Sequence, residues 1–309
     1  MDYSKNLLVK VAELYYNQNM NQQQIANKLK ISRVKVSRLL SEAKNRGIVQ
    51  IEIKYPTDNC IKLESEIEEK YELEEAVIIS SKGKSCDLVY KDVTNTVAQI
   101  FKEKVNDKDI IGIAWGRTLK HVTDKVSEIK KEVKIVQLLG NIGSSDVSGD
   151  VIVRNLANSF QGEILLLPTP AIVDNIEIKK AIMSDGNISN IFETQRLCTL
   201  AVVGIGEVSE ESTLVMSNYL SKEDLNELKI DGAVGEVCGM FVDKDGGLCN
   251  TSINNRVLGI NFDDLKNISC VVAVATGREK SESIKAVLKS GIIDVIVTDE
   301  TTAKRILQK

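Results

Sequence analysis

The sequence predicts an α/β domain with a largely parallel sheet, preceded by a small winged helix-turn-helix domain. Two capped amphipathic helices joined by a tight turn occupy residues 21–47. From residue 76 onward, β-branched apolar runs alternate with helical patterns, as expected of strands that are buried on both faces and joined by helices. Because Pro56 stops the strand before it, we expect one domain over residues 1–55 and a second over residues 56–309.

The helices of the first domain are recognised by their ends and by their apolar spacing. Asn21 and Ser32 are residue types that cap helix N-termini, and Gly47 is suited to end the second helix. Apolar residues recur at helical spacing in that helix, at Val36, Leu39, Leu40 and Ala43. A preceding helix carries the apolar stripe Leu7, Leu8, Val11, Leu14 and Tyr15. Residues 48–53 alternate as a short wing strand should.

The outer face of the second helix is polar and cationic. Such a helix can enter the major groove of DNA, where its N-terminal side chains reach base edges and flanking cations hold phosphates. A solvated basic helix in a small bundle is the alternative that the charge alone leaves open. We expect Ser32 and Lys35 to lie nearest the groove. The residues expected to contact double-stranded DNA are Gln22, Gln23, Ser32, Arg33, Lys35, Ser37 and Arg38.

Charge is divided unevenly along the chain. Residues 1–58 hold ten Lys and Arg against five Asp and Glu, a net of +5, whereas the remainder holds 30 against 39, a net of −9. The overall net charge of −4 argues against a general nucleic-acid coat protein. A basic head on an acidic body instead suits a head that meets phosphate and a body with another task.

Cysteine and histidine usage argues against a metal centre. The six cysteines form no C-x-x-C pair, and His121 is the only histidine, so we expect no zinc site and no cofactor. Reduced, mostly buried thiols in a cytoplasmic protein are the favoured interpretation. The N-terminus has no signal-peptide pattern, and no apolar run is long enough to span a bilayer.

The second domain is predicted to begin with a helix over residues 60–71, which we expect to join the two domains as a rigid lever. Another helix is predicted over residues 86–105. Seven β-branched, mostly apolar runs are the predicted strands of a largely parallel sheet. They cover residues 76–80, 109–115, 133–139, 163–167, 199–203, 269–274 and 294–298.

The end of the second predicted strand carries the sharpest site signal. Trp115 ends the strand, Gly116 makes the turn, and a helix is predicted to start at about Thr118. The N–H groups of Gly116, Arg117 and Thr118 would point beyond the strand with a helix dipole behind them, which suits a phosphate. An ordinary βα turn is the alternative. The spacing matches neither a P-loop nor a dinucleotide-binding fingerprint.

Four other features lie at or near predicted strand ends. Residues 137–143 and 203–206 are glycine-containing turns that can lend backbone donors to the same rim. Glu236 stands in an apolar, glycine-rich stretch, where a carboxylate is costly unless it is paired or faces a cavity. Either an exposed edge position or a hydroxyl-binding role explains it. Lys280 in the first turn of a helix opposes the dipole unless an anion is near, and a solvated lysine is its alternative.

Several of these stretches resemble one family. NQQQIANKLKISRVKVSRLLSEAKNRGIVQI resembles the head of the SorC family of bacterial sugar-responsive transcription regulators. IGIAWGRTL, VQLLGNIG, GAVGEVCGMFVDKDG and VTDETTAKRIL resemble that family's effector-domain motifs, in the same order. The resemblance spans essentially the whole chain. It implies a helix-turn-helix head and a sugar-phosphate-binding, oligomerising domain related to phosphosugar isomerases and CoA transferases, assembled as homodimers or homotetramers that hold operator DNA.

The resemblance also implies which residues bind the effector. The motif positions carried over are Gly116, Arg117, Thr118, Gly140, Asn141, Arg154, Asn155, Glu236 and Lys280. Of these, Arg154 and Asn155 are expected to begin the helix after VQLLGNIG. The position of Leu139 holds a cationic residue in some relatives that bind phosphorylated sugars. Leucine cannot pair with a second phosphate or form a Schiff base, which argues against a bisphosphate or a covalent aldehyde at this spot.

The sequence is also compatible with two other function classes. A phosphosugar isomerase-like enzyme needs a base beside the substrate carbon and a proton relay. Glu236 can serve as the base, but His121 lies in the helix after the proposed phosphate loop, where exposure or packing is expected, and a DNA-binding head has no place in a plain isomerase. An architectural DNA-binding protein without a ligand would not need glycine-lined strand ends. The sequence favours a ligand-controlled regulator of transcription.

Overall fold

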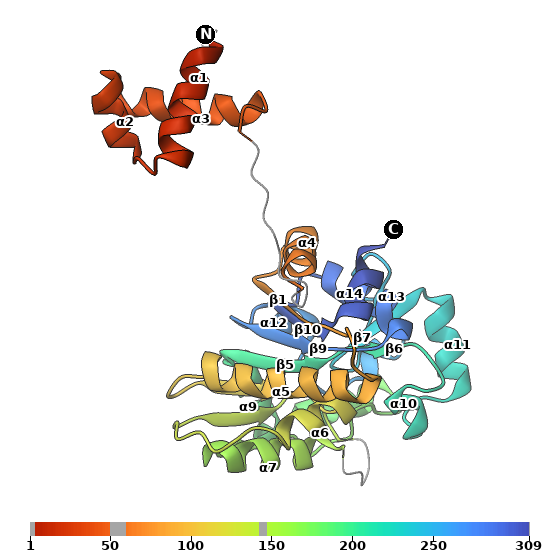
Figure 1. Ribbon diagram of the computed structural model, residues 1–309. Coiled ribbons are helices and arrows are strands. Elements are labelled where there is room, and N and C mark those ends of the chain that lie inside the picture. The colour runs from red at the N-terminus through yellow and green to blue at the C-terminus, as the bar shows by residue number, and fades with distance from the viewer. Residues whose placement is uncertain (1–3, 50–59, 142–146, 309) are drawn as a thin grey trace. The chain divides into compact units, whose positions relative to one another are not determined.

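The computed structural model describes residues 4–49, 60–141 and 147–308 (Figure 1). The chain divides into two compact units, Met1–Pro56 (unit 1) and Thr57–Lys309 (unit 2). Pro56 and residues 50–53 of the predicted wing strand lie outside the described ranges. Among the described residues, no helix is both long enough and apolar enough to cross a membrane.

Unit 1 contains the predicted helix-turn-helix. α1 (Lys5–Ala12) continues into a π-helical turn, η1 (Glu13–Asn17), and is followed by α2 (Gln22–Leu29) and α3 (Arg33–Asn45). The buried side chains of these helices pack into one small core. Those that line it are Leu8, Val11, Ala12, Leu14, Ile25, Ala26, Val36, Leu39, Leu40 and Ala43.

Both predicted caps of the helix pair are present. The Asn21 side chain accepts a hydrogen bond from the Gln24 N–H at 3.0 Å, and the Gln24 side chain accepts one from the Asn21 N–H at 2.9 Å, which forms a reciprocal capping box. Ser32 Oγ accepts from the Lys35 N–H at 3.2 Å. Lys30, at φ 52°, turns the chain between the two helices.

A seven-stranded parallel sheet forms the centre of unit 2, and each predicted run contributes one strand to it. The strand order is β1-β10-β9-β5-β2-β3-β4, and every neighbouring pair is parallel. The strands are β1 (Glu75–Ile79), β2 (Ile110–Ile113), β3 (Lys134–Gln137), β4 (Glu163–Leu165), β5 (Leu200–Gly204), β9 (Val271–Val274) and β10 (Val295–Asp299).

Helices cover both faces of this sheet, because right-handed crossovers that run in opposite directions along a sheet place their helices on opposite faces. Figure 1 shows α5, α6 and α7 together along one face. These are α5 (Cys86–Lys104), α6 (Arg117–Thr123) and α7 (Gly149–Phe160). Helices on the other side include α9 (Gly186–Arg196), α12 (Phe262–Lys266), α13 (Ser281–Lys289) and α14 (Glu300–Leu307).

The neighbouring strands β2 and β5 lie where the direction of travel reverses. From β2 the chain continues toward β3 and β4, whereas from β5 it continues toward β9 and β10. Such a switch point leaves a crevice beyond the carboxyl ends of the two strands, and that crevice is where open α/β sheets bind ligands. The strand order alone therefore predicts a ligand site beyond the carboxyl ends of β2 and β5.

A second, antiparallel sheet lies after β5. It consists of β6 (Gly206–Glu207), β7 (Ala233–Val237) and β8 (Met240–Asp243), with β7 in the middle. Helix α13 packs closely on β7, since a Cβ atom at Gly235 would lie 2.7 Å from the Ser283 carbonyl oxygen. Unit 2 also contains α8 (Ile176–Met183), α10 (Thr213–Met216), α11 (Lys222–Ile230), and the 3-10 turns η2 (Asn254–Arg256) and η3 (Arg278–Lys280).

The helix predicted before the sheet, α4 (Ile61–Tyr71), is fixed to the sheet edge. Glu64 and Glu68 accept hydrogen bonds from the N–H groups of Ile78 and Ala76 in β1, at 2.9 Å and 2.8 Å. These carboxylates satisfy donors that an edge strand would otherwise leave open. The helix is thus part of unit 2 and packs along the edge of the sheet, and its role as a rigid lever that joins the two domains stays a prediction.

Candidate functional site

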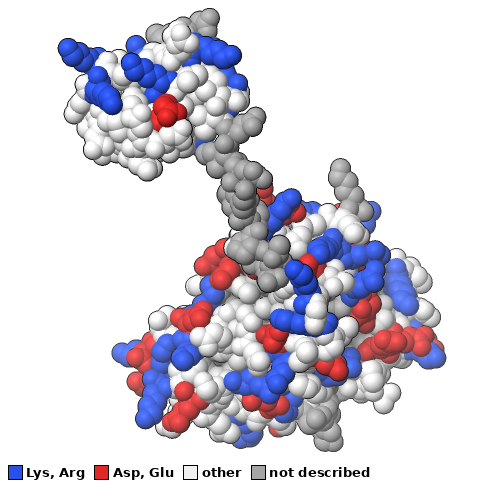
Figure 2. Space-filling model, viewed as in Figure 1, with Lys and Arg blue, Asp and Glu red and all other residues white. Residues whose placement is uncertain are grey.

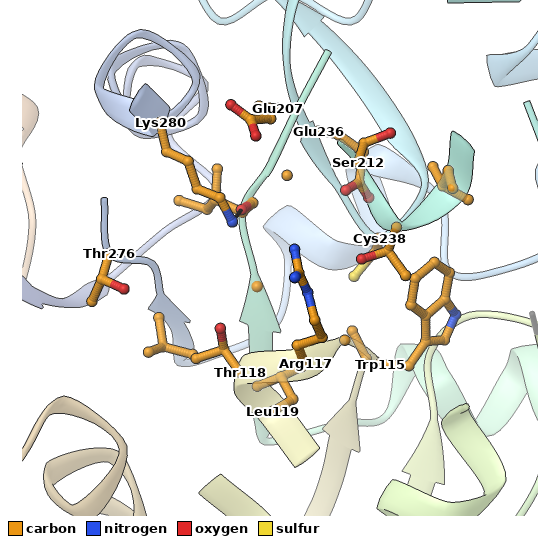
Figure 3. Close-up of a pocket in the computed structure, with 18 of the residues that line it drawn as sticks. Trp115, Arg117, Thr118, Leu119, Glu207, Ser212, Glu236, Cys238, Thr276 and Lys280 are labelled. Atoms are coloured by element: carbon orange, nitrogen blue, oxygen red, sulfur yellow. Dashed lines mark hydrogen bonds between the residues drawn. The ribbon is translucent and has the colours of Figure 1, made fainter. Parts of the chain in front are cut away.

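A cavity of about 420 Å³ lies at the switch point of the large sheet. Segments that follow β2, β5 and β9 form its wall, together with residues from the small sheet and from α10. Figure 3 shows the labelled side chains around it. Five of the predicted effector-binding residues line this cavity: Gly116, Arg117, Thr118, Glu236 and Lys280.

The predicted phosphate loop forms one wall. Gly116 has φ 140° and precedes α6, which starts at Arg117, one residue earlier than expected. Since few residues other than glycine adopt that φ value, Gly116 permits the abrupt change from strand to helix. The Arg117 guanidinium points into the cavity, and the Thr118 side chain lies beside it (Figure 3). The first turn of α6 therefore presents a cation, a hydroxyl and helix N-terminal backbone to one place.

Lys280 supplies a second cation from the other side of the cavity (Figure 3). It follows β9 after a turn at Gly277, whose N–H donates to Thr302 Oγ1 at 3.0 Å. The Lys280 ammonium donates to the Ile205 carbonyl oxygen at 3.5 Å and is half-buried. It is not the freely solvated lysine of the alternative interpretation.

Glu236 lies on β7, the middle strand of the small sheet, so the edge-position alternative is wrong. Its carboxylate accepts a hydrogen bond from the Gly239 N–H. Burial raises the pKa of Glu236 to about 7, against the opposing effects of the Gly239 bond and the Lys280 charge. A group with this pKa exchanges protons near neutral pH and can accept or donate a hydrogen bond.

The charges around the cavity are mixed. Besides Glu236, the acidic residues Glu207, Glu211 and Glu279 line it, together with the cations Arg117 and Lys280. Cations with nearby backbone donors suit an anionic group, whereas carboxylates suit hydroxyl donors. The arrangement fits a small molecule that carries an anion at one end and several hydroxyl groups elsewhere.

The predicted DNA-contacting residues lie on the surface of unit 1. Gln22, Gln23 and Arg33 line one shallow hollow beside Tyr15 and Tyr16. The exposed residues of the predicted set are Gln23, Ser32, Arg33, Lys35, Ser37 and Arg38, and Gln22 is half-buried. In Figure 2, the charged surface of unit 1 is mainly Lys and Arg, whereas unit 2 mixes both signs. Net positive charge is thus concentrated where the helix-turn-helix lies.

Comparison with known proteins identifies the family. A family model described as "Putative sugar-binding domain" matches residues 55–308. A deoxyribonucleoside regulator from Bacillus subtilis (strain 168) is 34% identical over 311 residues, which cover 99% of each chain. The chain belongs to the SorC/DeoR family of sugar-binding transcriptional regulators.

Solved structures of the SorC/DeoR family extend the match to the fold. The full-length sorbitol operon regulator SorC from Klebsiella pneumoniae has a TM-score of 0.77 at 29% identity, covering 98% of this chain and 99% of that one. A DeoR family transcriptional regulator from Listeria monocytogenes has a TM-score of 0.75 at 30% identity, covering 80% and 99%. These relatives are regulators of transcription and not isomerase-like enzymes, and this chain is a sugar-responsive transcriptional regulator.

Gly140 and Asn141, two other residues that the SorC resemblance assigned to the effector, do not line the cavity. The Gly140 carbonyl accepts a hydrogen bond from Trp115 Nε1 at 2.8 Å. A Cβ atom at Gly140 would lie 2.2 Å from the Pro170 carbonyl oxygen. Asn141 Oδ1 accepts from Gln137 Nε2 at 2.9 Å. Asn141 is thus bound to the end of β3, and Gly140 affects the cavity by positioning Trp115, which lines it.

The expected position of Arg154 and Asn155 requires correction. They stand in the middle of α7, which begins at Gly149 after the N-cap residue Ser148. Arg154 is exposed, and Asn155 Nδ2 donates to Asp124 Oδ1 at 3.1 Å. Neither residue lines the cavity. Because α7 starts at Gly149, earlier than expected, Arg154 and Asn155 lie in its second turn and away from the strand ends.

The cavity also contains residues that sequence reasoning did not assign to it. Trp115 and Thr276 each precede a turn glycine, which is a usable signal, and Cys238 follows Glu236 by two positions. Ser212 lies in a stretch without periodic pattern and has no such signal. Further lining residues that the sequence did not assign to the cavity include Tyr90, Glu207, Glu211, Thr213, Glu279 and His121. As expected, His121 packs locally and is exposed: its Nδ1–H donates to the Arg117 carbonyl oxygen at 2.7 Å.

Proposed function

We propose that this SorC/DeoR-family regulator binds double-stranded operator DNA of a carbohydrate-catabolism operon, and that a phosphorylated sugar or related anionic metabolite in the unit 2 cavity changes its operator affinity. The observation that carries the proposal is the convergence of Arg117, Lys280 and Glu236 on one cavity at the switch point of the sheet. Residues 1–55 would form the DNA-binding domain, and residues 56–309 the effector and oligomerisation domain.

The phosphate would lie against the first turn of α6. Backbone N–H groups at a helix start together with a positive dipole end favour an anion. Arg117 adds a forked donor, Thr118 adds a hydroxyl, and the Lys280 ammonium approaches from the facing wall. These groups line one cavity, so we expect a monophosphate to lie between them. Leu139 lines the same cavity and supplies neither a second phosphate contact nor a Schiff-base amine.

The hydroxyl groups of the ligand would meet the acidic side of the cavity. Glu236 and Glu207 lie across the cavity from Arg117, and Glu207 is near Lys280 (Figure 3). When the polar groups of a site form hydrogen bonds only with ligand hydroxyls, an analogue that lacks one hydroxyl binds much more weakly, because it leaves a buried polar group unpaired. The names of two relatives, a sorbitol operon regulator and an erythritol catabolism regulatory protein, fit a polyhydroxylated ligand, whereas the name of a third, a deoxyribonucleoside regulator, refers to a sugar that lacks one hydroxyl group.

DNA binding is proposed for unit 1. The N-terminal part of a second helix in a helix-turn-helix contacts base edges, and the exposed cations of α3 are Arg33, Lys35, Arg38 and Lys44. Regulation requires that the effector bind one arrangement of the protein more tightly than another, because equal affinity for both shifts nothing. An assembly of two or four copies would provide such alternative arrangements.

Thermal unfolding with matched ligand pairs tests the proposal. Each phosphorylated sugar or polyol would be compared with its unphosphorylated form and with inorganic phosphate, for example ribose 5-phosphate with ribose and sorbitol 6-phosphate with sorbitol. A ligand that binds only the folded state raises the Tm as its concentration exceeds Kd. We expect one phosphorylated compound to raise the Tm and also to shift operator affinity in a gel-shift titration. Stabilisation by unphosphorylated forms alone would contradict the phosphate assignment.

A further inference from the structure

Val34 is an apolar side chain on the outside of unit 1. It is the second residue of α3 and is 62% exposed. The core of unit 1 takes its α3 contribution from Val36, Leu39, Leu40 and Ala43, and Val34 is not among the residues packed against that core. Exposed valines are common as isolated residues, so the position of this one on the helix decides what it means.

Val34 stands on the line of α3 that faces directly away from the core. Residues spaced i, i+4 and i+7 share one face of a helix, and Val34, Arg38 and Ser41 have this spacing and are all exposed. The buried residues of α3 lie half a turn away from that line. Lys35, which the sequence placed nearest the groove, stands on the flank. The most outward ridge of α3 therefore begins with a valine.

Helix stability does not call for valine at this place. In an exposed helical position valine has a lower propensity than alanine, lysine or arginine, because its branched side chain loses rotamer freedom. Its methyl groups meet water in the free protein. A bound partner that offers apolar surface would remove them from water, which is favourable at a rate set by the apolar area buried.

We propose that Val34 reads a thymine in the operator by packing its side chain against the thymine C5-methyl group. The inference rests on the proposed docking of α3 in the major groove. N-terminal residues of a recognition helix face base edges, and the thymine methyl is the apolar group that the major groove presents. Arg33 and Arg38, both exposed on α3, would hold phosphates or guanine edges on either side. Val34 would thus fix one T·A pair in each half-site.

Thymine and deoxyuridine differ only by this methyl group, so they provide a direct test. A binding site would first be selected from random duplexes with the full-length protein. Each thymine in one half-site would then be replaced by deoxyuridine in turn, and Kd measured by fluorescence anisotropy. We expect one replacement to weaken the parent about three- to fivefold, the effect of one buried methyl group.

Variants of the protein test whether Val34 causes this loss of affinity for the deoxyuridine duplex. Val34→Ala should bind the thymine and deoxyuridine duplexes with nearly equal affinity, because the side chain that contacts the methyl is gone. Val9→Ala provides a matched control, since Val9 is also apolar, helical and 47% exposed in unit 1 but lies on α1. Val9→Ala should distinguish the thymine duplex from the deoxyuridine duplex as strongly as the parent does. Unchanged thermal unfolding would verify that both variants fold.

The outcomes separate this inference from the proposed function. If the parent binds a selected duplex but no deoxyuridine replacement changes its Kd, Val34 does not read a thymine. The same conclusion follows if Val34→Ala discriminates as strongly as the parent. If the parent binds no duplex at any concentration tested, DNA binding itself fails, and the inference falls with it.

Discussion

Gly206 of β6 lies opposite Glu236 of β7, and a Cβ atom at Gly206 would stand 2.2 Å from Oε2 of Glu236. The carboxylate therefore occupies the space that any side chain at position 206 would need. The Gly239 N–H holds the other carboxylate oxygen. Together the two glycines place the acid at the cavity wall, so the position of Glu236 depends on the small sheet as well as on its own strand.

Replacing Gly206 should consequently disturb the ligand more than the fold. Gly206→Ala must displace the Glu236 carboxylate, and we expect effector affinity to fall about tenfold, the cost of one hydrogen bond to a charged group. Isothermal titration with the cognate effector would measure the loss. In a Glu236→Ala background the same glycine substitution should have little further effect, because the displaced group is absent. Additive losses would mean that Gly206 acts independently of Glu236.

Glu236 should also make stability depend on pH. Burial raises its pKa in the folded protein from the ordinary 4.5 to about 7, so the folded state keeps a proton that the unfolded state releases. The resulting stabilisation is complete below pH 4.5, is lost as the pH rises toward 7 and stays absent above it. Glutamine does not titrate. The Tm of Glu236→Gln minus that of the parent should therefore increase over this interval and then level off. A difference that is constant with pH would contradict the raised pKa.

The fold followed from the sequence because its strands are buried on both faces and its helices carry strong caps. The strand ends were less well predicted. The run over residues 109–115 extends past β2, which ends at Ile113, since Ala114 is buried without belonging to the strand and Trp115 lines the cavity. An apolar pattern reports burial, and burial continues past the last residue of the strand, where the Ala114 N–H still donates to the Val202 carbonyl oxygen of β5 at 3.1 Å. The small sheet β6-β7-β8 was not predicted, because its strands are short and two of them, β6 and β7, contain glycine.

Within the site, most of the predicted residues that line the cavity are those whose position depends on a single turn. Gly116, Arg117 and Thr118 follow β2 directly, and Lys280 follows β9. Prediction failed where tertiary contacts decide. Asn141 faces inward to Gln137, which no local pattern encodes. Ser212 reaches the cavity through a loop and the start of α10, and that path depends on how β5 connects to the small sheet.

Unit 1 should owe its DNA affinity largely to phosphate contacts. Arg38→Ala removes an exposed cation from the outward ridge of α3, and we expect weaker operator binding and a salt dependence whose logarithmic slope is smaller by about 1. Arg33→Ala should behave similarly. Lys244→Ala, which removes an exposed cation from unit 2, serves as the control. Unchanged affinity and slope in both α3 variants would place the DNA interface elsewhere.

Assembly is a further expectation. One helix-turn-helix offers a small interface, and tight binding normally comes from two half-sites read by a symmetric pair. Light scattering coupled to size exclusion should give a molar mass of at least twice 34.1 kDa at micromolar concentration. A protein that remains monomeric with and without DNA would require another explanation for operator affinity.

The two cations of the cavity allow binding of effector to be separated from binding of DNA. Arg117 and Lys280 line the cavity of unit 2, whereas the proposed DNA contacts are in unit 1. Charge-assisted hydrogen bonds contribute roughly 1.5–3 kcal/mol each, so Arg117→Ala or Lys280→Ala should lower effector affinity about tenfold or more. Arg278→Ala removes a neighbouring exposed cation that does not line the cavity and should leave effector affinity unchanged.

Operator binding by the same variants completes the test. Because the substitutions lie outside unit 1, Arg117→Ala and Lys280→Ala should bind operator DNA with the affinity of the parent when no effector is present. Their gel-shift response should then appear only at about tenfold higher effector concentration, since the effector shifts the equilibrium by its differential affinity alone. Variants that respond like the parent would move the effector site away from this cavity. Loss of DNA binding in both would instead assign these residues to the stability of unit 2.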